Sequence, residues 1–451
     1  MKSLRLFDDR IFYKSLFAIA LPIMLQNLIN SSVNMIATVM IGRLGTVEIA
    51  AVGLGNQVFF LLNMILFGVS SGGAVFTAQY WGKKDIEGIR KNTGLCLVIV
   101  LVITSIFTAA CVIFPRVIIG WYSSDPAVIE CGSVYLRAVA PCFIPFSISF
   151  VFTLIMRTIE KVKLPMIATF FALSLNVALS YLFIFGAGAI PAMGVAGSAL
   201  ATVITRLIEM CILLGFSYGR KYALAGTPRE LFGFDSAFAG RFFQIALPVI
   251  INELLWSLGI TMQNVIFART QTDAIAAFNI TNTVSQLTWV VFIGLGNGAA
   301  VLIGKKIGEG EELTARSYAR KITLFAPLMA AAVALLLLPL SWILPFLFNV
   351  NAHVFSIINA MFIILMLSYP FRAFNMSMVI GVCRSGGDTL FSVFYDIAFM
   401  WGFSLPLAAA ASFIFHAPVW LIFLCLATED PLKMFIGIWR LKSGKWLHNV
   451  T

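Results

Sequence analysis

Two acidic residues lie inside long apolar stretches of this sequence, where a charge is costly. Glu253 follows Pro248 in one stretch, and Asp396 follows Tyr395 in another. A carboxylate at the centre of a bilayer costs roughly 2.5–3.5 kcal/mol on insertion scales. Such a group can take up and release a proton, Na⁺ or an organic cation, so we nominate both residues for ion coupling and as candidate Na⁺ ligands. The alternatives are structural: Glu253 satisfied by a neighbouring helix, and Asp396 paired with a base such as Arg384.

Neutral polar side chains stand in the apolar stretches of the first half of the chain. Amide and hydroxyl oxygens can hold Na⁺, or hydrogen-bond a substrate, without titrating. The alternative is hydrogen bonding between helices, worth about 0.6 kcal/mol for each bond. The residues nominated for ion coupling or substrate binding are Asn27, Asn34, Gln57, Asn176, Ser180 and Thr202.

Other charged residues in apolar stretches are spaced so that they can neutralise one another. Glu429 and Lys433 stand four positions apart, and Arg206 and Glu209 stand three apart. Residues at these spacings share one face of a helix. We therefore predict structural pairs at both places. For Arg372 we favour a hydrogen bond between helices, or a side chain that reaches the membrane surface, over anion binding.

The elements that carry these residues are membrane-spanning helices. The chain has 451 residues, of which 60% are hydrophobic and 11% charged, against about 25% charged in soluble domains. Apolar runs of about 20 residues, long enough to cross a hydrocarbon core of roughly 30 Å, recur throughout. The pattern predicts an all-α integral membrane protein with twelve helices, near residues 15–41, 48–80, 92–114, 128–156, 164–186, 194–218, 241–268, 274–304, 321–347, 354–382, 389–412 and 416–440.

The second half of the chain repeats the first in the same direction. The segment Ile-Ala-Leu-Pro occurs at residues 19–22 and again at 245–248, an offset of 226. Further matches at that offset pair Arg43, Gly68, Gly72 and Gly82 with Arg269, Gly294, Gly298 and Gly308. Parallel repeats within a membrane are typical of transporters that hold substrate between their halves. We predict an N-terminal lobe over residues 1–217, a cytoplasmic linker over 218–240 and a C-terminal lobe over 241–451.

The net charge of +11 is placed as a membrane protein requires. With twelve spans, nearly all lysines and arginines fall on one side, which predicts cytoplasmic termini and excludes a nucleic-acid partner. We expect the basic N-terminal segment to be retained rather than cleaved as a signal peptide. We find no phosphate-binding glycine motif and no Cys-x-x-Cys spacing among the seven cysteines. The protein is expected not to be an enzyme, and any uphill transport is expected to use an ion gradient or to be driven by a separate protein.

Four stretches have the pattern of a known family. They read Ala-Leu-Pro followed by T-V-M-I-G-R-L-G, N-V-A-L-S-Y-L-F-I-F-G, G-V-A-G-S-A-L-A-T and R-S-G-G-D-T, at residues 20–22 with 38–45, 176–186, 194–202 and 384–389. With the repeat and the helix count, the chain resembles the multidrug and toxic compound extrusion (MATE) transporters, in their NorM/DinF-like bacterial branch. The resemblance covers essentially the whole chain.

The resemblance implies a fold and a function. The fold is two pseudo-symmetric six-helix lobes forming a V with a central cavity. The function is secondary antiport, in which cationic or amphipathic small molecules such as drugs and toxic metabolites leave the cell in exchange for Na⁺ or H⁺. We expect a monomer that spans the bacterial inner membrane many times and has no cofactor besides the coupling ion.

The chain departs from the family pattern at its acids. Ala37 stands where the family has an aspartate tied to ion coupling, and no acid matches the one that NorM-like proteins carry in helix 10, where this chain reads Arg-Ala-Phe-Asn over residues 372–375. Asn27 is the repeat mate of Glu253, so we expect the titratable chemistry in the second half. The alternatives are a flippase for lipid-linked precursors from the same superfamily, and a degenerate, non-coupled membrane protein.

Overall fold

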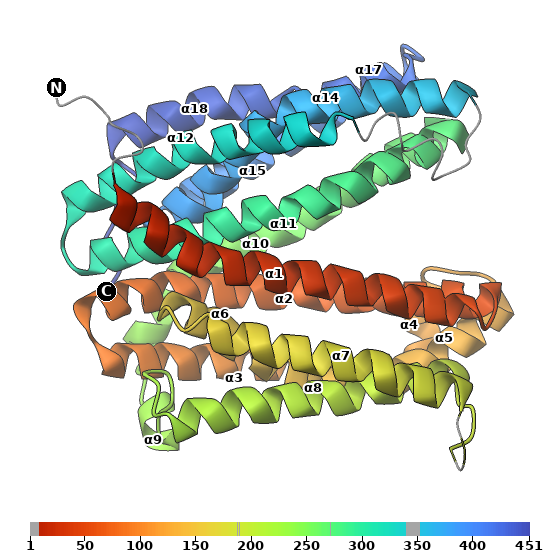
Figure 1. The fold of residues 1–451 in the computed structure, drawn as a ribbon, viewed down its shortest axis with the longest axis horizontal. Helices are drawn as coiled ribbons and strands as arrows, with labels where there is room; N and C mark the ends of the chain where they lie inside the picture. The colour runs from red at the N-terminus through yellow and green to blue at the C-terminus, as the bar shows by residue number, and fades with distance from the viewer. Residues whose placement is uncertain (1–8, 187, 189, 271, 340–351) are drawn as a thin grey trace. The chain divides into compact units, whose positions relative to one another are not determined.

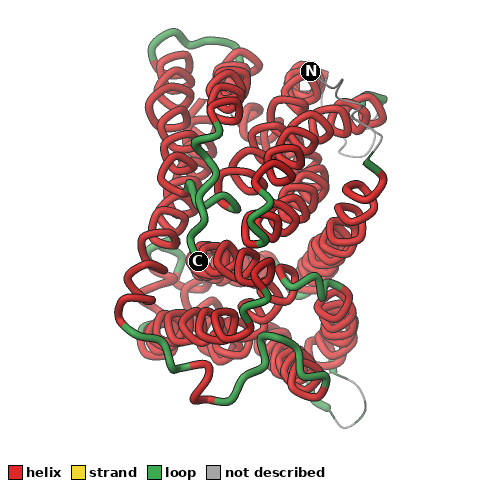
Figure 2. The backbone as a smooth tube through the Cα atoms, turned by 90° about the vertical axis from the view of Figure 1, so that its left-hand side faces the viewer, coloured by secondary structure: helices red, strands yellow, loops and turns green. Residues whose placement is uncertain are grey.

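The polypeptide is almost entirely helical in the computed structural model, which describes residues 9–186, 188, 190–270, 272–339 and 352–451 (Figures 1 and 2). An isolated β-bridge pairs Gly387 with Leu447. Eleven helical stretches of this part of the chain are long and apolar enough to cross a membrane. The predicted all-α membrane architecture is confirmed.

The first half of the chain provides six of these eleven stretches. One of them is interrupted: α5 passes through the short 3₁₀ turn η1 (Ala140–Cys142) into α6. Two short helices, α4 (Pro115–Gly120) and α9 (Pro228–Leu231), were not predicted. The long helices are α1 (Arg10–Gly42), α2 (Thr46–Lys83), α3 (Ile86–Ile113), α5 (Pro126–Val139) with α6 (Phe143–Thr158), α7 (Lys163–Phe185) and α8 (Gly194–Gly219).

The second half contains two π-helical segments, η2 (Ser377–Arg384) and η3 (Met400–Ser404). The helix expected over residues 416–440 is divided at Thr428, and the end expected at residue 347 lies outside the described residues. The α-helices are α10 (Ser236–Thr270), α11 (Thr272–Gly308), α12 (Glu312–Leu337), α14 (Ala352–Met376), α15 (Thr389–Phe399), α16 (Leu405–Phe413), α17 (Val419–Ala427) and α18 (Glu429–Ser443).

Local signals at helix starts explain several boundaries. Asp85 precedes α3 and accepts a hydrogen bond from the Gly88 amide at 2.9 Å. Asp125 precedes α5, accepts from the Ala127 amide at 2.9 Å and is followed by a proline at the first helical position. A side chain that accepts from the first turn satisfies an amide that has no partner in the helix. The helices therefore begin where the sequence offers a cap.

The starts of the helices recur at the offset of the sequence repeat. The beginnings of α1, α2, α3, α5 and α7 lie 226 positions before those of α10, α11, α12, α14 and α15, and α8 precedes α17 by 225. Each repeat also has a proline inside its first helix, Pro22 and Pro248. α17 and α18 together therefore correspond to α8, and the predicted repeat is confirmed.

The helices group into two compact units that do not follow the halves of the sequence strictly. One unit contains residues 25–77 and 84–243, and the other contains residues up to 24, 78–83 and those from 244 onward. In the first unit, α7 and α8 run side by side (Figure 1). In the second, α12 packs along α14. The predicted lobes of residues 1–217 and 241–451 stay a prediction.

Two glycines let helices α2 and α11 approach closely. A Cβ atom on Gly82 would lie 2.1 Å from the carbonyl oxygen of Lys305, and one on Gly308 would lie 1.9 Å from that of Gln79. Both obstacles are backbone atoms, which cannot move aside as a flexible side chain can. Only glycine fits at these two positions without separating the helices.

We expect Gly82→Ala to destabilise the protein by about 1–3 kcal/mol, the usual cost of forcing extra atoms into a packed site. The measurement is the thermal unfolding midpoint of the purified protein in detergent. Gly53→Ala is the control in the same helix, because a Cβ there would meet nothing within 4 Å. The control should be neutral or slightly stabilising, since alanine favours helix by up to about 1 kcal/mol over glycine. Equal midpoints for the two variants would contradict the packing argument.

Candidate functional site

Glu253 and Arg384 form a buried ion pair. Arg384 Nη2 donates to Glu253 Oε1 at 2.6 Å, and the two residues are 8% and 4% exposed. Glu253 lies in α10, just over one turn after the helix-internal proline. Arg384 ends η2, a π-helical segment, and π-bulges in helices often occur at functional sites. In this structure Glu253 is therefore satisfied by another helical segment, as the structural alternative predicted, and its partner there is a charged side chain.

Asp396 has a different cation from the one that we considered. Lys433 Nζ donates to Asp396 Oδ1 at 3.1 Å and to Glu429 Oε1 at 3.4 Å. The amide of Asn252, the neighbour of Glu253 in α10, donates to Asp396 Oδ2 at 3.2 Å. The basic partner suggested for Asp396, Arg384, binds Glu253 instead. The pair predicted from the Glu429–Lys433 spacing is confirmed, with Asp396 as a third member.

A second pair lies beside this group. Arg372 Nε donates to Asp430 Oδ2 at 3.0 Å, so the predicted hydrogen bond between helices is confirmed for Arg372. Asn375 donates to Asp430 Oδ1 at 3.2 Å and accepts from the Tyr395 hydroxyl at 2.6 Å. The stretch of residues 372–375, which lacks an acid to match that of the family, therefore supplies an arginine and an amide that bind an acid from α18.

The charges of these side chains do not balance. We define the charged network as Glu253, Asp396, Glu429 and Asp430 together with Arg372, Arg384 and Lys433. Its formal charge is −1, because four carboxylates meet three cations. The excess lies where Asp396 and Glu429 share one ammonium group. A buried charge without full compensation is unfavourable in a medium of low dielectric.

Lys433 is expected to be essential for stability. Lys433→Met would leave two buried carboxylates without their cation, and breaking a buried pair typically costs about 3–5 kcal/mol. Lys306 is a matched control, because it also binds two carboxylates, Glu309 at 2.6 Å and Glu311 at 3.0 Å. Its side chain is 23% exposed against 4% for Lys433, so Lys306→Met should cost about 1 kcal/mol or less. Similar unfolding midpoints for the two variants would contradict this account.

The neutral candidates of the first half are brought together only in part. Asn176 donates to Thr202 Oγ1 at 3.4 Å and to Thr205 Oγ1 at 3.1 Å. Ser180, one turn from Asn176, is buried, and its hydroxyl has no hydrogen-bond partner among the described residues. The other three candidates do not join this group: Asn27 is half-buried, and Asn34 and Gln57 are exposed.

A second polar network, in the compact unit of residues 25–77 and 84–243, includes residues that were not nominated from the sequence. Gln26 Oε1 accepts from Arg157 Nη2 at 2.6 Å, and its amide nitrogen donates to Thr169 at 2.7 Å. Thr169 donates to Glu209 at 2.8 Å, and Arg206 binds the other oxygen of Glu209 at 2.7 Å, which confirms that predicted pair. Gln26 directly precedes the nominated Asn27, but the sequence alone does not show which of these two amides is buried.

The two halves of the chain match one family model. The model described as MatE matches residues 22–182 and again residues 248–410. The two matches cover more than half of the chain and begin 226 positions apart. The chain belongs to the MatE family.

Relatives of this MatE chain include proteins named for drug resistance. It is 24% identical over 435 residues to "Probable multidrug resistance protein NorM" of Thermotoga maritima, with 96% of this chain and 93% of that protein covered. It is 23% identical over 403 residues to "Probable multidrug resistance protein YoeA" of Bacillus subtilis, with 89% and 87% covered.

Solved structures of transporters show the fold. The MATE transporter VcmN of Vibrio cholerae in its bent form matches with a TM-score of 0.86 at 17% identity, covering 97% of this chain and 99% of that one. A MOP superfamily transporter of Pyrococcus furiosus, described as having a binding pocket of reverse polarity, matches with a TM-score of 0.84 at 18% identity and 96% coverage of both chains. This MatE chain is therefore a multi-pass membrane protein with the fold of the MATE transporters.

The acids of this MatE chain do not gather as a conventional metal site. Among the residues that the structure describes, no three His, Cys, Asp or Glu side chains are grouped to hold a metal ion. Glu253 and Asp396, the pair nominated for Na⁺, each bind a cationic side chain. Ala37, in α1, is half-buried and offers no side-chain ligand.

The turn at residues 384–389, which has the family's R-S-G-G-D-T pattern, is held by side chains of α18 and α2. Asp388 binds Arg440 at 2.7 Å, and burial raises the pKa of Asp388 although the Arg440 guanidinium lowers it. Gln79, at the end of α2, donates to the carbonyl oxygens of Ser385 and His448, both at 3.1 Å. The Gln79 side chain therefore ties the turn to the segment that follows α18.

Proposed function

We propose that this protein is a secondary active antiporter that exports cationic or amphipathic small molecules in exchange for Na⁺ or H⁺. The observation that carries the proposal is the charge of the charged network, which is −1 within a buried part of the second half. Membership of the MatE family and the names of the relatives support the substrate class. The Asp396–Lys433–Glu429 group is the place where the excess charge lies.

The excess charge gives a physical basis for exchange. A proton, a Na⁺ ion or a cationic substrate can neutralise it, and only one of them is needed at a time. Binding of one cation therefore disfavours binding of another, which is the requirement for antiport. Exchange of one monovalent cation for another moves no net charge, so the concentration gradient of the coupling ion drives it, and each tenfold gradient supplies about 1.4 kcal/mol.

The charged network also connects the nominated acids. Asn252 bonds Asp396 from α10, and the next residue of that helix is Glu253, whose partner Arg384 lies in η2. Loading or unloading Asp396 thus changes the surroundings of α10 and η2 through hydrogen bonds. We propose that Asp396 and Glu253 act together, with Asp396 nearer to the uncompensated charge.

The test is transport by the purified protein in proteoliposomes. A fluorescent organic cation is followed under imposed gradients of Na⁺ or of H⁺, and flux that depends on one gradient supports antiport and identifies the ion. If no cation moves but labelled lipids cross the bilayer, the flippase alternative is supported and antiport is refuted. If neither moves, the protein is a non-coupled membrane protein.

We further propose that the protein lies in the bacterial inner membrane with both termini cytoplasmic. Lysines and arginines precede α1 and stand in the last turns of α2, α11 and α18, and the positive-inside rule puts these ends in the cytoplasm. Labelling of single cysteines in intact cells checks the orientation. A cysteine in place of Lys84 should be protected from an impermeant reagent, and one in place of Arg43 should react.

A further inference from the structure

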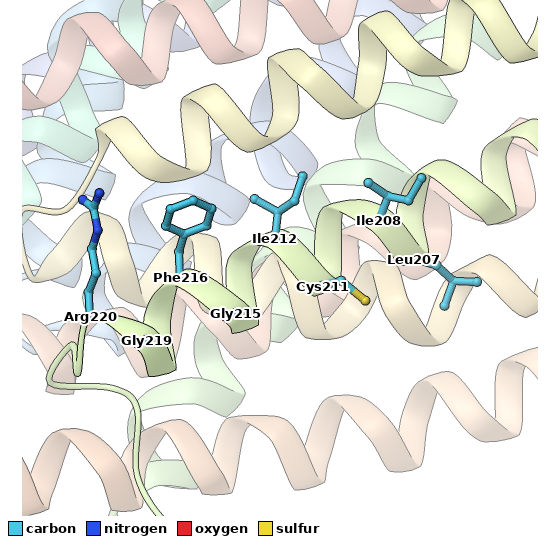
Figure 3. A pocket seen from close by; sticks show the side chains of 8 residues that line it. All are labelled: Leu207, Ile208, Cys211, Ile212, Gly215, Phe216, Gly219 and Arg220. Carbon is cyan, nitrogen blue, oxygen red and sulfur yellow. The ribbon is translucent and has the colours of Figure 1, made fainter.

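An open groove runs along the surface of α8 (Figure 3). It lies within the unit that contains residues 25–77 and 84–243. All of its lining comes from α8 and the residue that follows it, and only one end is charged. The lining residues are Leu207, Ile208, Cys211, Ile212, Gly215, Phe216, Gly219 and Arg220.

The middle of the groove is hollow because it contains glycines. A Cβ atom added to Gly215 or Gly219 would meet nothing within 4 Å. Leu207 and Phe216 are 43% and 45% exposed, so large apolar side chains border a space that the described residues of this unit leave open. In a membrane-spanning helix, such a space faces the hydrocarbon of the lipids.

The length of the groove fits one leaflet of a bilayer. Residues 207–220 of a helix extend over about 20 Å at 1.5 Å for each residue. Half of a hydrocarbon core of roughly 30 Å is about 15 Å. The charged end, at Arg220, therefore reaches the level of the headgroups when the apolar part lies along the acyl chains.

The charged end of the groove is basic. The Arg220 guanidinium lies 5.5 Å from the centre of the Phe216 ring, and Lys221 follows it. The Lys161 ammonium lies 5.7 Å from the centre of the Tyr222 ring, which places a third cation beside the same helix end. Within the described part of the chain, none of the three cations forms a salt bridge with a carboxylate.

We propose that this groove binds an anionic phospholipid. An acyl chain lies over Gly215 and Gly219, and the phosphate group faces Arg220 and Lys221. Charge complementarity supports this occupant, because the basic end attracts a negative headgroup while the apolar lining accepts a hydrocarbon chain. The site is distinct from the charged network, which lies in the other compact unit.

A second copy of the chain is a weaker candidate for the groove. Cys211, Gly215 and Gly219 have the spacing of small residues that lets membrane helices pack closely. In a twofold-symmetric dimer, however, the same surface meets itself. The basic ends of two parallel copies of α8 would then face each other, and Arg220 would meet its own image.

The test is lipid binding by the purified full-length protein in detergent, followed by native mass spectrometry. Phosphatidylglycerol is compared with phosphatidylcholine of the same acyl composition. Wild type should bind phosphatidylglycerol at least about fivefold more tightly, the factor that one basic side chain at a membrane surface is worth. Arg220→Gln should lower this preference about fivefold, because Lys221 still faces the headgroup, and Gly215→Leu should weaken the binding of both lipids by filling the groove.

Matched controls use open sites elsewhere on the chain. Gly53→Leu adds a leucine at another helix position with free space, and Arg43→Gln removes another exposed arginine; both should bind lipid as wild type does. Equal affinity of wild type for the two lipids, or unchanged binding in Gly215→Leu, overturns the proposal. If the wild type is a dimer, and Gly215→Leu dissociates the dimer without changing the bound lipid, the groove belongs to a second copy of the chain. This result would also overturn the lipid proposal. Arg220 is exposed, so if Gly215→Leu fails to fold, Arg220→Gln decides: a reduced lipid preference supports the proposal, and an unchanged preference overturns it.

Discussion

Asp396→Asn is expected to abolish ion-driven exchange and to leave the protein folded. The substitution makes the charged network neutral, while Lys433 keeps Glu429 as its carboxylate partner. The carbonyl oxygen of the new amide can still accept from Lys433, and its NH2 group can donate to Asn252 once the Asn252 amide turns its side-chain oxygen, which has no partner among the described residues now, toward it. Without a negative charge to neutralise, the site no longer attracts a cation, and gradient-driven exchange should fall to the level of liposomes without protein.

The measurement is gradient-driven uptake of a fluorescent cation in proteoliposomes, together with the unfolding midpoint in detergent. Glu130→Gln is the control, because Glu130 pairs with Arg116 at 2.6 Å on an exposed surface. The control should transport as wild type does. Glu429→Gln also neutralises the network and leaves Lys433 paired with Asp396, so it should lose coupling too. Wild-type exchange by Asp396→Asn would show that the excess charge has no part in coupling.

Glu253→Gln is expected to lose both transport and stability. The substitution removes the carboxylate that Arg384 contacts at 2.6 Å, and a buried pair that loses one member typically costs about 3–5 kcal/mol. The single variant therefore cannot separate a functional role from a structural one. The double variant Glu253→Gln/Arg384→Gln can, because it removes both charges together.

We expect the double variant to regain most of the unfolding midpoint and to remain inactive in the proteoliposome assay. Replacing both members of a buried pair by neutral groups is often close to neutral for stability. If the pair only holds α10 against η2, the double variant should recover transport along with stability. Recovery of wild-type flux would remove Glu253 from the coupling machinery and leave Asp396 as the nominated acid.

The positions of the helices could be predicted well because they depend on local patterns. The apolar runs and the offset between Pro22 and Pro248 indicate two copies of one set of helices, and the observed helix starts follow that offset. The division of the last predicted helix at Thr428 was missed. The residues before Thr428 are as apolar as those of a continuous membrane span. The acids Glu429 and Asp430, which begin α18, come only after the break.

The partners of the acids could be predicted only where they are close in sequence. The Glu429–Lys433 and Arg206–Glu209 pairs follow from spacings of four and three on one helix face. The partner of Asp396 comes from another helix, 37 positions away, and several cations stand at similar distances along the chain. Which one faces Asp396 depends on how the helices pack, and the sequence has no local signal for that.

The close approach of α2 and α11 has a consequence for how the two repeats came to differ. Gly82 and Gly308 are repeat mates, and so are the groups that they touch, at Lys305 and Gln79. The contact of Gly82 with Lys305 is thus equivalent to the contact of Gly308 with Gln79. The interface of a homodimer with twofold symmetry repeats its contacts in the same way. In a single-repeat ancestor, one codon would have set both sides at once. In the joined chain each side can diverge alone: Gln79 now binds the segment after α18, while a lysine occupies the equivalent place.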